Sequence, residues 1–325
     1  MKCVNVVWSI LTVGVLMTIA GPAAAQQTYP GKPIRLIVPF APGGGTNIVA
    51  RLIGQTLSEN LGQQVNVDNR PGGNTVIGSE ALVKSPPDGY TIIMVTVAHA
   101  INPHLFPTPY DAIRDFAPVA SVVGSELLLV VHPSLPANDL RGFIALAKSK
   151  PGQLNYATSG SGTSSHLAAE YFNILAAVKI QHIPYKGSGP ALTDLIGGQV
   201  QLSFQSPSAV VAHIKSGKLN PIAITGQARA PALPQVPTFT EAGLPGLDVK
   251  LWYGVLAPAG TPKPIIDRLS TELAAILAVP EFKEKLASQG VEPFFSTPEQ
   301  FAALIRTDYA KYGKIIKTAN IKLED

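Results

Sequence analysis

The sequence has a single cysteine, Cys3, and it lies close to the N-terminus. A disulfide scaffold therefore cannot form within the chain, and thiolate zinc sites and iron–sulfur clusters lack their ligands. Charged residues are also scarce, at 14%, and the formal net charge is only +4. No cluster of lysine and arginine appears, which argues against a nucleic-acid-binding protein. Apolar residues make up 46% of the chain, a proportion that excludes disorder for most of it.

Long apolar runs are confined to the N-terminus. Lys2 precedes an apolar run over residues 4–20, which ends at the small residues 23–25. This order is typical of a secretory signal, so we predict a cleaved signal peptide at residues 1–25, with an uncleaved membrane anchor as the alternative. Cleavage would remove Cys3 and suit an oxidising compartment. No later stretch reaches the ~18 consecutive apolar residues that a spanning helix needs.

Short apolar strands alternate with amphipathic segments along the rest of the chain. The run Ile34–Phe40 is rich in β-branched residues, and Thr46–Asn60 places its apolar residues on one helical face before Gly62. The alternation restarts near residue 126, which predicts an α/β protein with two lobes, each a mostly parallel sheet flanked by helices. Further strands are expected at 65–67, 91–97, 126–131, 155–158, 179–185, 200–204, 221–225 and 251–257. Further helices are expected at 74–83, 140–149, 164–177, 190–196, 208–216, 264–278, 281–289 and 298–317.

The restart of the pattern divides the chain into two lobes. We expect the first lobe to comprise residues 26–127 and 250–325, and the second to comprise 128–249. The C-terminal helices would then pack on the first lobe after a return crossing at 251–257. Two chain crossings between lobes form a natural hinge, so we expect a cleft that opens and closes.

Two glycine-rich turns, Pro39–Asn47 and Thr158–His166, each lie between a predicted strand and the start of a helix. Glycine allows the backbone to approach a ligand closely, and free N–H groups with the positive end of the helix dipole attract anions. Further hydrogen bonds can come from the hydroxyls of Thr46, Ser159, Ser161 and Thr163. One such turn can simply close a tight connection. Two of them on separate lobes favour a small anion gripped from both sides of the cleft.

Neither glycine-rich turn matches a nucleotide-binding motif. The P-loop requires Gly-Lys followed by Ser or Thr, whereas Gly217-Lys218 precedes Leu219. The Rossmann pattern requires a third glycine, and Ile48 and Ser165 stand at those positions. Nucleotide binding is therefore not predicted.

Short motifs run through the whole predicted mature chain. They are Tyr29–Asn47, Asn69–Asn74, Pro87–Tyr90, Ser159–Thr163 with His166, Pro184–Gly187 and His213–Lys218. Together and in this order they resemble the Bug family, the extracytoplasmic solute receptors of tripartite tricarboxylate transporters. The resemblance implies a type II-like periplasmic binding protein that closes on a small carboxylate and delivers it to membrane transporter subunits. It also implies a periplasmic location and a monomer.

The resemblance also assigns a binding site. In the family, the two glycine-rich loops grip a carboxylate largely through main-chain groups and ordered water. By motif match these groups belong to Phe40, Gly44, Gly45 and Asn47 in the first loop and to Ser159, Gly160, Ser161, Gly162 and Thr163 in the second.

Two positions depart from the family pattern. Asn47 and Gln205 stand where many relatives carry aspartate. Asparagine retains the capping function without the negative charge, and glutamine can hydrogen-bond but cannot pair a ligand ammonium. We therefore expect a ligand whose remainder is uncharged or anionic rather than an amino acid.

Two histidines are further candidates for ligand binding. His166 lies one turn into the helix after the second glycine turn, where it either faces the cleft or packs locally. His99 follows a predicted strand at the same sheet edge as the turns. No two histidines have H-x-x-x-H spacing, so neither a metal site nor a cofactor is expected.

Two other classes of function are a secreted hydrolase and a sensor receptor. A secreted hydrolase would use Ser161 as nucleophile and His166 as base, but glycines on both sides of Ser161 break the G-x-S-x-G pattern. We therefore predict no catalytic residue and no enzyme activity. A sensor receptor that passes its bound state to a signalling protein is not separated from a transport receptor by the sequence.

Overall fold

The structure is a computed structural model that describes residues 29–247 and 249–319, and strands alternate with helices through most of this range. The strands are β1 (Ile34–Val38), β2 (Val65–Asn69), β3 (Thr91–Thr96), β4 (Phe116–Ser125), β5 (Leu128–Val131), β6 (Asn155–Thr158), β7 (Gln181–Pro184), β8 (Leu202–Gln205), β9 (Asn220–Ile224), β10 (Leu251–Pro258) and β11 (Glu292–Ser296). The α-helices are α1 (Gly45–Leu61), α2 (Val76–Val83), α3 (Ala98–Ile101), α4 (Leu140–Ser149), α5 (Ser164–Ala176), α6 (Ser188–Ile196), α7 (Pro207–Lys215), α8 (Lys263–Ala278), α9 (Pro280–Ser288) and α10 (Pro298–Ala319). Two short 3-10 turns are η1 (Gly73–Thr75) and η2 (Asn102–His104).

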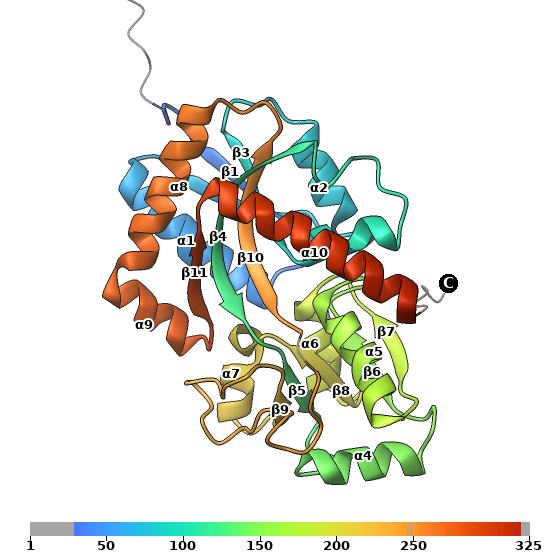
Figure 1. The fold of residues 1–325 in the computed structure, drawn as a ribbon. Helices are drawn as coiled ribbons and strands as arrows, with labels where there is room; N and C mark the ends of the chain where they lie inside the picture. Colours follow the sequence, from blue (N-terminus) through green and yellow to red (C-terminus); the bar gives the residue numbers. More distant parts are fainter. Residues whose placement is uncertain (1–28, 248, 320–325) are drawn as a thin grey trace, which may run out of the picture.

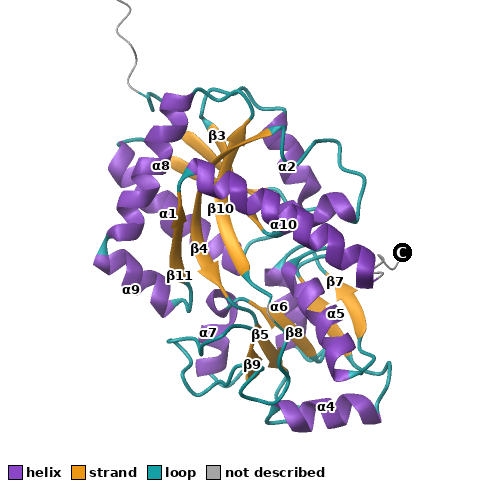
Figure 2. Ribbon diagram, viewed as in Figure 1, coloured by secondary structure: helices purple, strands orange, loops and turns teal. Residues whose placement is uncertain are grey.

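The strands form two separate sheets, one in each lobe (Figure 1). The first has the order β11-β4-β10-β3-β1-β2 and the second the order β7-β6-β8-β5-β9. Both sheets are mixed, and helices flank them in Figure 2. The predicted two-lobed α/β class is confirmed, because each lobe holds one sheet flanked by helices. The expectation of mostly parallel sheets is wrong, because three of the five strand pairings in the first sheet and two of the four in the second are antiparallel. The predicted signal peptide lies outside the described residues.

Strand β1 lies next to the edge strand β2 of the first sheet. Four of the five residues of β1 are buried, and it pairs in parallel with β2 and β3. The return strand β10 pairs antiparallel with β3 and β4, and β4 pairs antiparallel with β11. Helix α1 packs on this sheet and ends at Gly62, which takes the left-handed conformation (φ 65°) that the sequence predicts for its cap.

The second sheet has apolar layers on both faces. Leu129 and Val131 of β5 join the core that contains Phe172 and Phe204, whereas Leu128 and Val130 join a second cluster on the opposite face. Successive residues of a strand point to opposite faces, so the continuous apolar run of β5 predicts burial on both sides.

Two strands of the first sheet, β4 and β11, were not predicted. Pro118 and Gly124 interrupt the apolar pattern of β4, and both residue types are poor strand formers. The strand forms because β10 and β11 pair with it on its two sides. The edge strand β11 leaves Phe294 and Phe295 exposed, so its side-chain pattern does not indicate a buried strand.

The chain passes between the sheets twice, once between β4 and β5 and once between β9 and β10. The two crossings lie side by side, because β4 and β10 remain paired up to Ser125 and Leu251. Beyond that pair, the Leu127 amide donates to the Thr225 hydroxyl at 3.0 Å, and this hydroxyl donates to the Val249 carbonyl at 2.9 Å. These contacts agree with the expected lobe boundaries, which stay a prediction.

Candidate ligand-binding site

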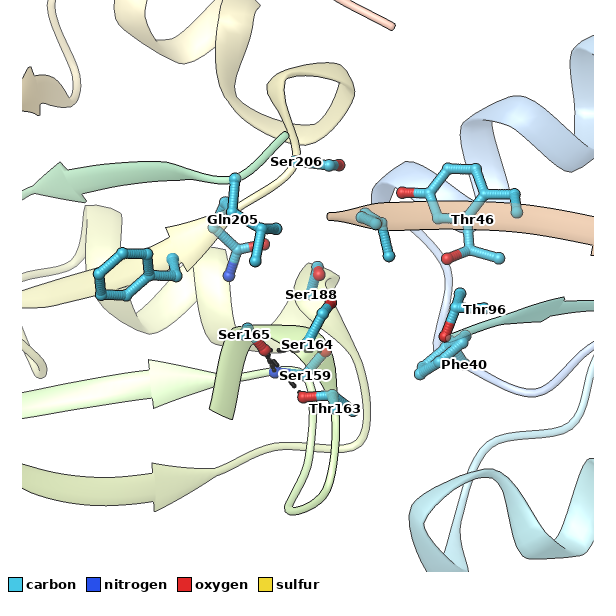
Figure 3. Close-up of a pocket in the computed structure, with 15 residues that line it drawn as sticks. Phe40, Thr46, Thr96, Ser159, Thr163, Ser164, Ser165, Ser188, Gln205 and Ser206 are labelled. Atoms are coloured by element: carbon cyan, nitrogen blue, oxygen red, sulfur yellow. Dashed lines mark hydrogen bonds between the residues drawn. The ribbon is translucent and has the colours of Figure 1, made fainter. Parts of the chain in front are cut away.

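A small cavity, with a volume of about 30 Å³, lies between the two lobes. Figure 3 shows side chains from both lobes converging on it. It is lined by Phe40, Gly44, Thr46, Thr96, Leu127, Ser159, Thr163, Ser164, Ser165, Ser188, Phe204, Gln205, Ser206, Leu251 and Tyr253. None of these residues carries a formal charge at neutral pH, and the polar side chains among them are hydroxyls and one amide. We call this space the first cavity.

Four helices begin at the first cavity. Helix α1 starts after Gly44, α5 after Thr163, α6 after Gly187 and α7 after Ser206. None of these four starts has a side-chain hydrogen bond that caps it. The first N–H groups of a helix lack partners within the helix, and its dipole places about half a positive charge there. The cavity therefore attracts an anion although no cationic side chain lines it.

Tyr253 of β10 joins the two lobes at the cavity wall. Its hydroxyl forms hydrogen bonds with Thr46 of the first lobe and with Ser206 and Ser208 of the second. Burial raises the pKa of Tyr253, and the hydrogen bonds with these hydroxyls offset only part of that rise. The phenol therefore stays neutral and leaves no negative charge to oppose an anion in the cavity.

The two lobes also touch through their loops. The Ala41 amide donates to the Lys186 carbonyl at 3.0 Å. At Gly160 (φ 134°) an added Cβ would lie 2.8 Å from Asn74 Oδ1, and at Gly162 (φ 72°) it would lie 2.7 Å from Asn102 Oδ1. Both glycines have a positive φ that other residues rarely adopt, and both leave no room for a side chain beside the first lobe. The cleft is thus closed in this structure.

A second cavity, of about 250 Å³, adjoins the first and shares Phe40 and Ser159 with it. It is lined by Pro39, Phe40, Gly72, Gly73, Asn74, Thr75, Ser159, Ser161, Pro184, Tyr185 and Lys186. Lys186 is the charged residue among them. Asn74 (φ 50°) and Thr75 (φ 76°) have left-handed backbones, and such strain in residues other than glycine gathers at functional sites. The Asn102 amide supports this turn by donating to Thr75 Oγ1 at 2.9 Å.

His166 lies behind the second glycine turn rather than in a cavity wall. Its Nδ1 accepts a hydrogen bond from the Gly162 amide at 3.2 Å, and its ring stacks on His182 with 4.2 Å between centroids. Burial lowers the pKa of His166 to about 4, so the ring is neutral and can act as this acceptor. The stack positions the turn, and a direct role of His166 in binding stays a prediction.

Asn47 and His99 hold neighbouring structure. The Asn47 amide donates to Asn69 Oδ1 at 3.0 Å, and Asn69 in turn donates to the Phe40 carbonyl at 2.8 Å. His99 is buried, its Nε2 lies 2.8 Å from the Ala112 carbonyl, and its ring packs edge-on against Phe116. Burial lowers the pKa of His99 to about 4, which keeps it neutral. Neither residue is among those lining the two cavities, and their predicted ligand contacts stay predictions.

The structure brings most predicted site residues to the cleft. The first cavity takes Phe40, Gly44, Thr46, Ser159, Thr163 and Gln205, and the second takes Ser161. Gly45 lies against Ser206, Ser208 and Tyr253, and Gly160 and Gly162 form the interlobe contacts described above.

Sequence reasoning missed several lining residues: Thr96, Ser164, Ser165, Ser188, Ser206 and Tyr253. Ser206-Pro207 carries a signal that could have been used, because serine before proline marks a helix start directly after a strand.

Within residues 29–247 and 249–319, no group of three His, Cys, Asp or Glu side chains is placed to hold a metal ion. Over the same ranges, no helix combines the length and apolar character that a membrane crossing needs.

Comparisons with known proteins place the chain among solute receptors. The model of the tripartite tricarboxylate transporter family receptor matches residues 49–321. Protein BugT of Bordetella pertussis is 37% identical over 325 residues, which cover 98% of this chain and 100% of BugT. Rpa4515 of R. palustris, solved with adipate, is 37% identical with a TM-score of 0.88 and covers 90% of this chain and 99% of its own. MatC of Rhodopseudomonas palustris, solved with bound malate, is 31% identical with a TM-score of 0.84 and covers 89% and 100%.

Proposed function

Because this chain belongs to the family of tripartite tricarboxylate transporter receptors, we propose that it captures a small carboxylate between its lobes and delivers it to a membrane transporter of that type. The receptors of this family bind solutes and are not enzymes, so the expectation of a non-catalytic protein is confirmed. Adipate and malate, found with two structural neighbours, are both carboxylates. We place the mature protein in the periplasm, after cleavage of residues 1–25.

One observation carries this proposal: four uncapped helix starts, contributed by both lobes, meet at a cavity without charged side chains. A carboxylate there would accept hydrogen bonds from backbone N–H groups and from serine and threonine hydroxyls. Such a ligand would neutralise the positive ends of helices in both lobes at once. It would therefore stabilise the closed arrangement more than the open one, which is what a capture protein requires.

The two adjoining cavities suggest how the ligand lies. We assign the carboxylate to the helix starts where the first cavity meets the second, beside Phe40 and Ser159, which line both. The other residues assigned to it are Gly44, Gly45, Thr46, Gly160, Gly162, Thr163 and Gln205. The remainder of the ligand would extend past Ser161 into the larger cavity. Lys186 at that cavity favours an anionic or neutral remainder and opposes a cationic one.

A hydrolase mechanism receives no support from the geometry. His166 accepts from the Gly162 amide and stacks on His182, and no hydrogen bond joins it to Ser161 within the described residues. The pKa of His166, lowered to about 4, also makes it a weak base at neutral pH.

A thermal-shift screen of the mature protein tests the proposal. The panel contains mono-, di- and tricarboxylates, with neutral sugars and cationic amines as controls. A true ligand at about a hundredfold above its dissociation constant should stabilise the protein by roughly 2.7 kcal/mol. If no carboxylate raises the melting temperature while another class of solute does, the proposed function is wrong.

The transport step needs its own experiment. Uptake of the carboxylate found in the screen is measured in cells with and without the gene. Loss of uptake that the restored gene rescues supports delivery to a transporter. Unchanged uptake with loss of a carboxylate-dependent transcriptional response would identify a sensor receptor instead.

A further inference from the structure

The amide of Gln205 has an unsatisfied atom at the first cavity. Gln205 ends β8, lines the cavity and is only 1% exposed. Its Oε1 is buried and has no hydrogen-bond partner among the described residues. In Figure 3 this oxygen lies on the side of Gln205 that faces the first lobe. A buried acceptor of this kind calls for a donor in the neighbouring space.

The orientation of the Gln205 amide follows from its neighbours. The Ser203 hydroxyl lies 2.6 Å from the Ala157 carbonyl oxygen, to which it must donate its only hydrogen. Ser203 Oγ can therefore only accept from Gln205, and it does so from Nε2 at 2.8 Å. A flipped amide would set two acceptors against each other. Gln205 thus presents its carbonyl oxygen, and not its NH₂ group, as the atom left without a partner.

The size of the space limits what the donor can be. The first cavity has a volume of about 30 Å³, which suits a group as small as a water molecule or a hydroxyl. The starts of α5 and α7, which would bind the carboxylate, border the same space through Ser164 and Ser206. A donor in this cavity must therefore be attached next to the carboxylate.

Charge decides between a hydroxyl and an ammonium group. No aspartate or glutamate is among the residues that line either cavity, so a buried ammonium would have no counter-charge. The positive ends of the four helices would also oppose a cation. A neutral hydroxyl meets the requirement of Gln205 Oε1 without either cost.

We propose that Gln205 Oε1 accepts a hydrogen bond from a ligand hydroxyl adjacent to the bound carboxylate, so that the receptor selects 2-hydroxycarboxylates. This inference rests on the proposed function and names its substrate class. An analogue without the hydroxyl leaves Oε1 unpaired in the closed cleft. The expected discrimination is on the order of tenfold in affinity.

The test measures dissociation constants by isothermal titration calorimetry for pairs that differ by one hydroxyl, namely malate with succinate and lactate with propionate. We expect the wild type to bind at least one hydroxylated member about tenfold more tightly than its partner. Gln205→Met removes the acceptor at similar size. It should reduce this ratio to about two or less by weakening the hydroxylated ligand.

The exposed Gln199 gives a matched control, because Gln199→Met makes the same chemical change away from the cleft. It should keep the wild-type ratio. If Gln205→Met does not fold, the inference is tested on the wild type alone, by its affinity ratios for the two ligand pairs and by its affinity for aspartate. Equal affinities within both pairs, an unchanged ratio in a folded Gln205→Met, or aspartate binding as tight as malate would each overturn the inference. Failure of every carboxylate to bind would instead overturn the proposed function.

Discussion

Replacing Gly189 by alanine should weaken ligand capture without altering a residue that lines either cavity. Gly189 lies in the first turn of α6, and an added Cβ would approach the Pro42 carbonyl oxygen closer than 3.0 Å and its carbonyl carbon to 3.1 Å. Pro42 belongs to the glycine turn of the first lobe, beside the backbone hydrogen bond from Ala41 to Lys186. The alanine methyl group therefore opposes the contact between the two loops.

The expected size of the effect follows from this overlap. Forcing one extra methyl group into a packed contact costs about 1–3 kcal/mol. The penalty falls only on the closed arrangement, because the overlapping atoms belong to different lobes. Each ~1.4 kcal/mol of closed-state penalty lowers affinity tenfold, so the dissociation constant for the carboxylate should rise about 5- to 150-fold.

Calorimetry measures the affinity, and fluorescence of Trp252 reports on the crossing strand, since Trp8 is the other tryptophan and lies in the predicted signal peptide. Gly197→Ala at the exposed end of the same helix is the control, and it should bind like the wild type. The gain in helix propensity at residue 189 is offset by the restriction before Pro190, so the ligand-free melting temperature should change little. Equal affinities for Gly189→Ala and the wild type would refute the reasoning, because the loop contact would then be absent from the ligand-bound form.

Two further predictions concern stability. The pKa of His166 is lowered from 6.5 to about 4 and that of His182 to about 3, both first by burial, so the unfolded chain gains protons before the folded one as the pH falls. The contribution of each histidine to the free energy of unfolding is complete above about pH 6.5 and declines by up to ~1.4 kcal/mol per pH unit below it. Urea unfolding at pH 7.5 and at pH 5 should therefore show a smaller loss of stability for His182→Gln than for the wild type. Equal losses of stability would contradict the prediction. The Trp252 indole donates to Asp308 Oδ2 at 2.7 Å in a buried setting. Asp308→Ala should therefore cost about 1–3 kcal/mol in urea unfolding and Asp308→Asn less, whereas equal costs would show that the hydrogen bond contributes nothing.

The glycine turns could be predicted from sequence because their signals are local. The buried run Ile34–Phe40, three consecutive glycines and the amphipathic segment from Thr46 specify a strand, a tight turn and a helix within a few residues. The strand β4 could not be predicted in this way. It contains Pro118 and Gly124, and only pairing with β10 and β11, which come more than a hundred residues later, makes it a strand.

The candidate site followed the same division. The hydroxyls of Thr46, Ser159 and Thr163 were found because they belong to the turns. Tyr253 was not, because its role depends on Ser206 and Ser208 of the opposite lobe. The unpaired oxygen of Gln205 likewise becomes visible only when the contacts of Ser203 are known. Contacts across lobes leave no periodic pattern in the sequence.

The side-by-side crossings have a mechanical consequence. Any rotation of one lobe against the other must turn about an axis near Ser125 and Leu251, where paired β4 and β10 leave the first sheet together. Tyr253 lies two residues from Leu251 on β10 and therefore moves little in such a rotation. Pro42 and Gly189 belong to loops of different lobes and separate when the cleft opens. Small substitutions at these two loops therefore change how far the lobes can close. The groups beside the rotation axis keep their alignment while the lobes rotate.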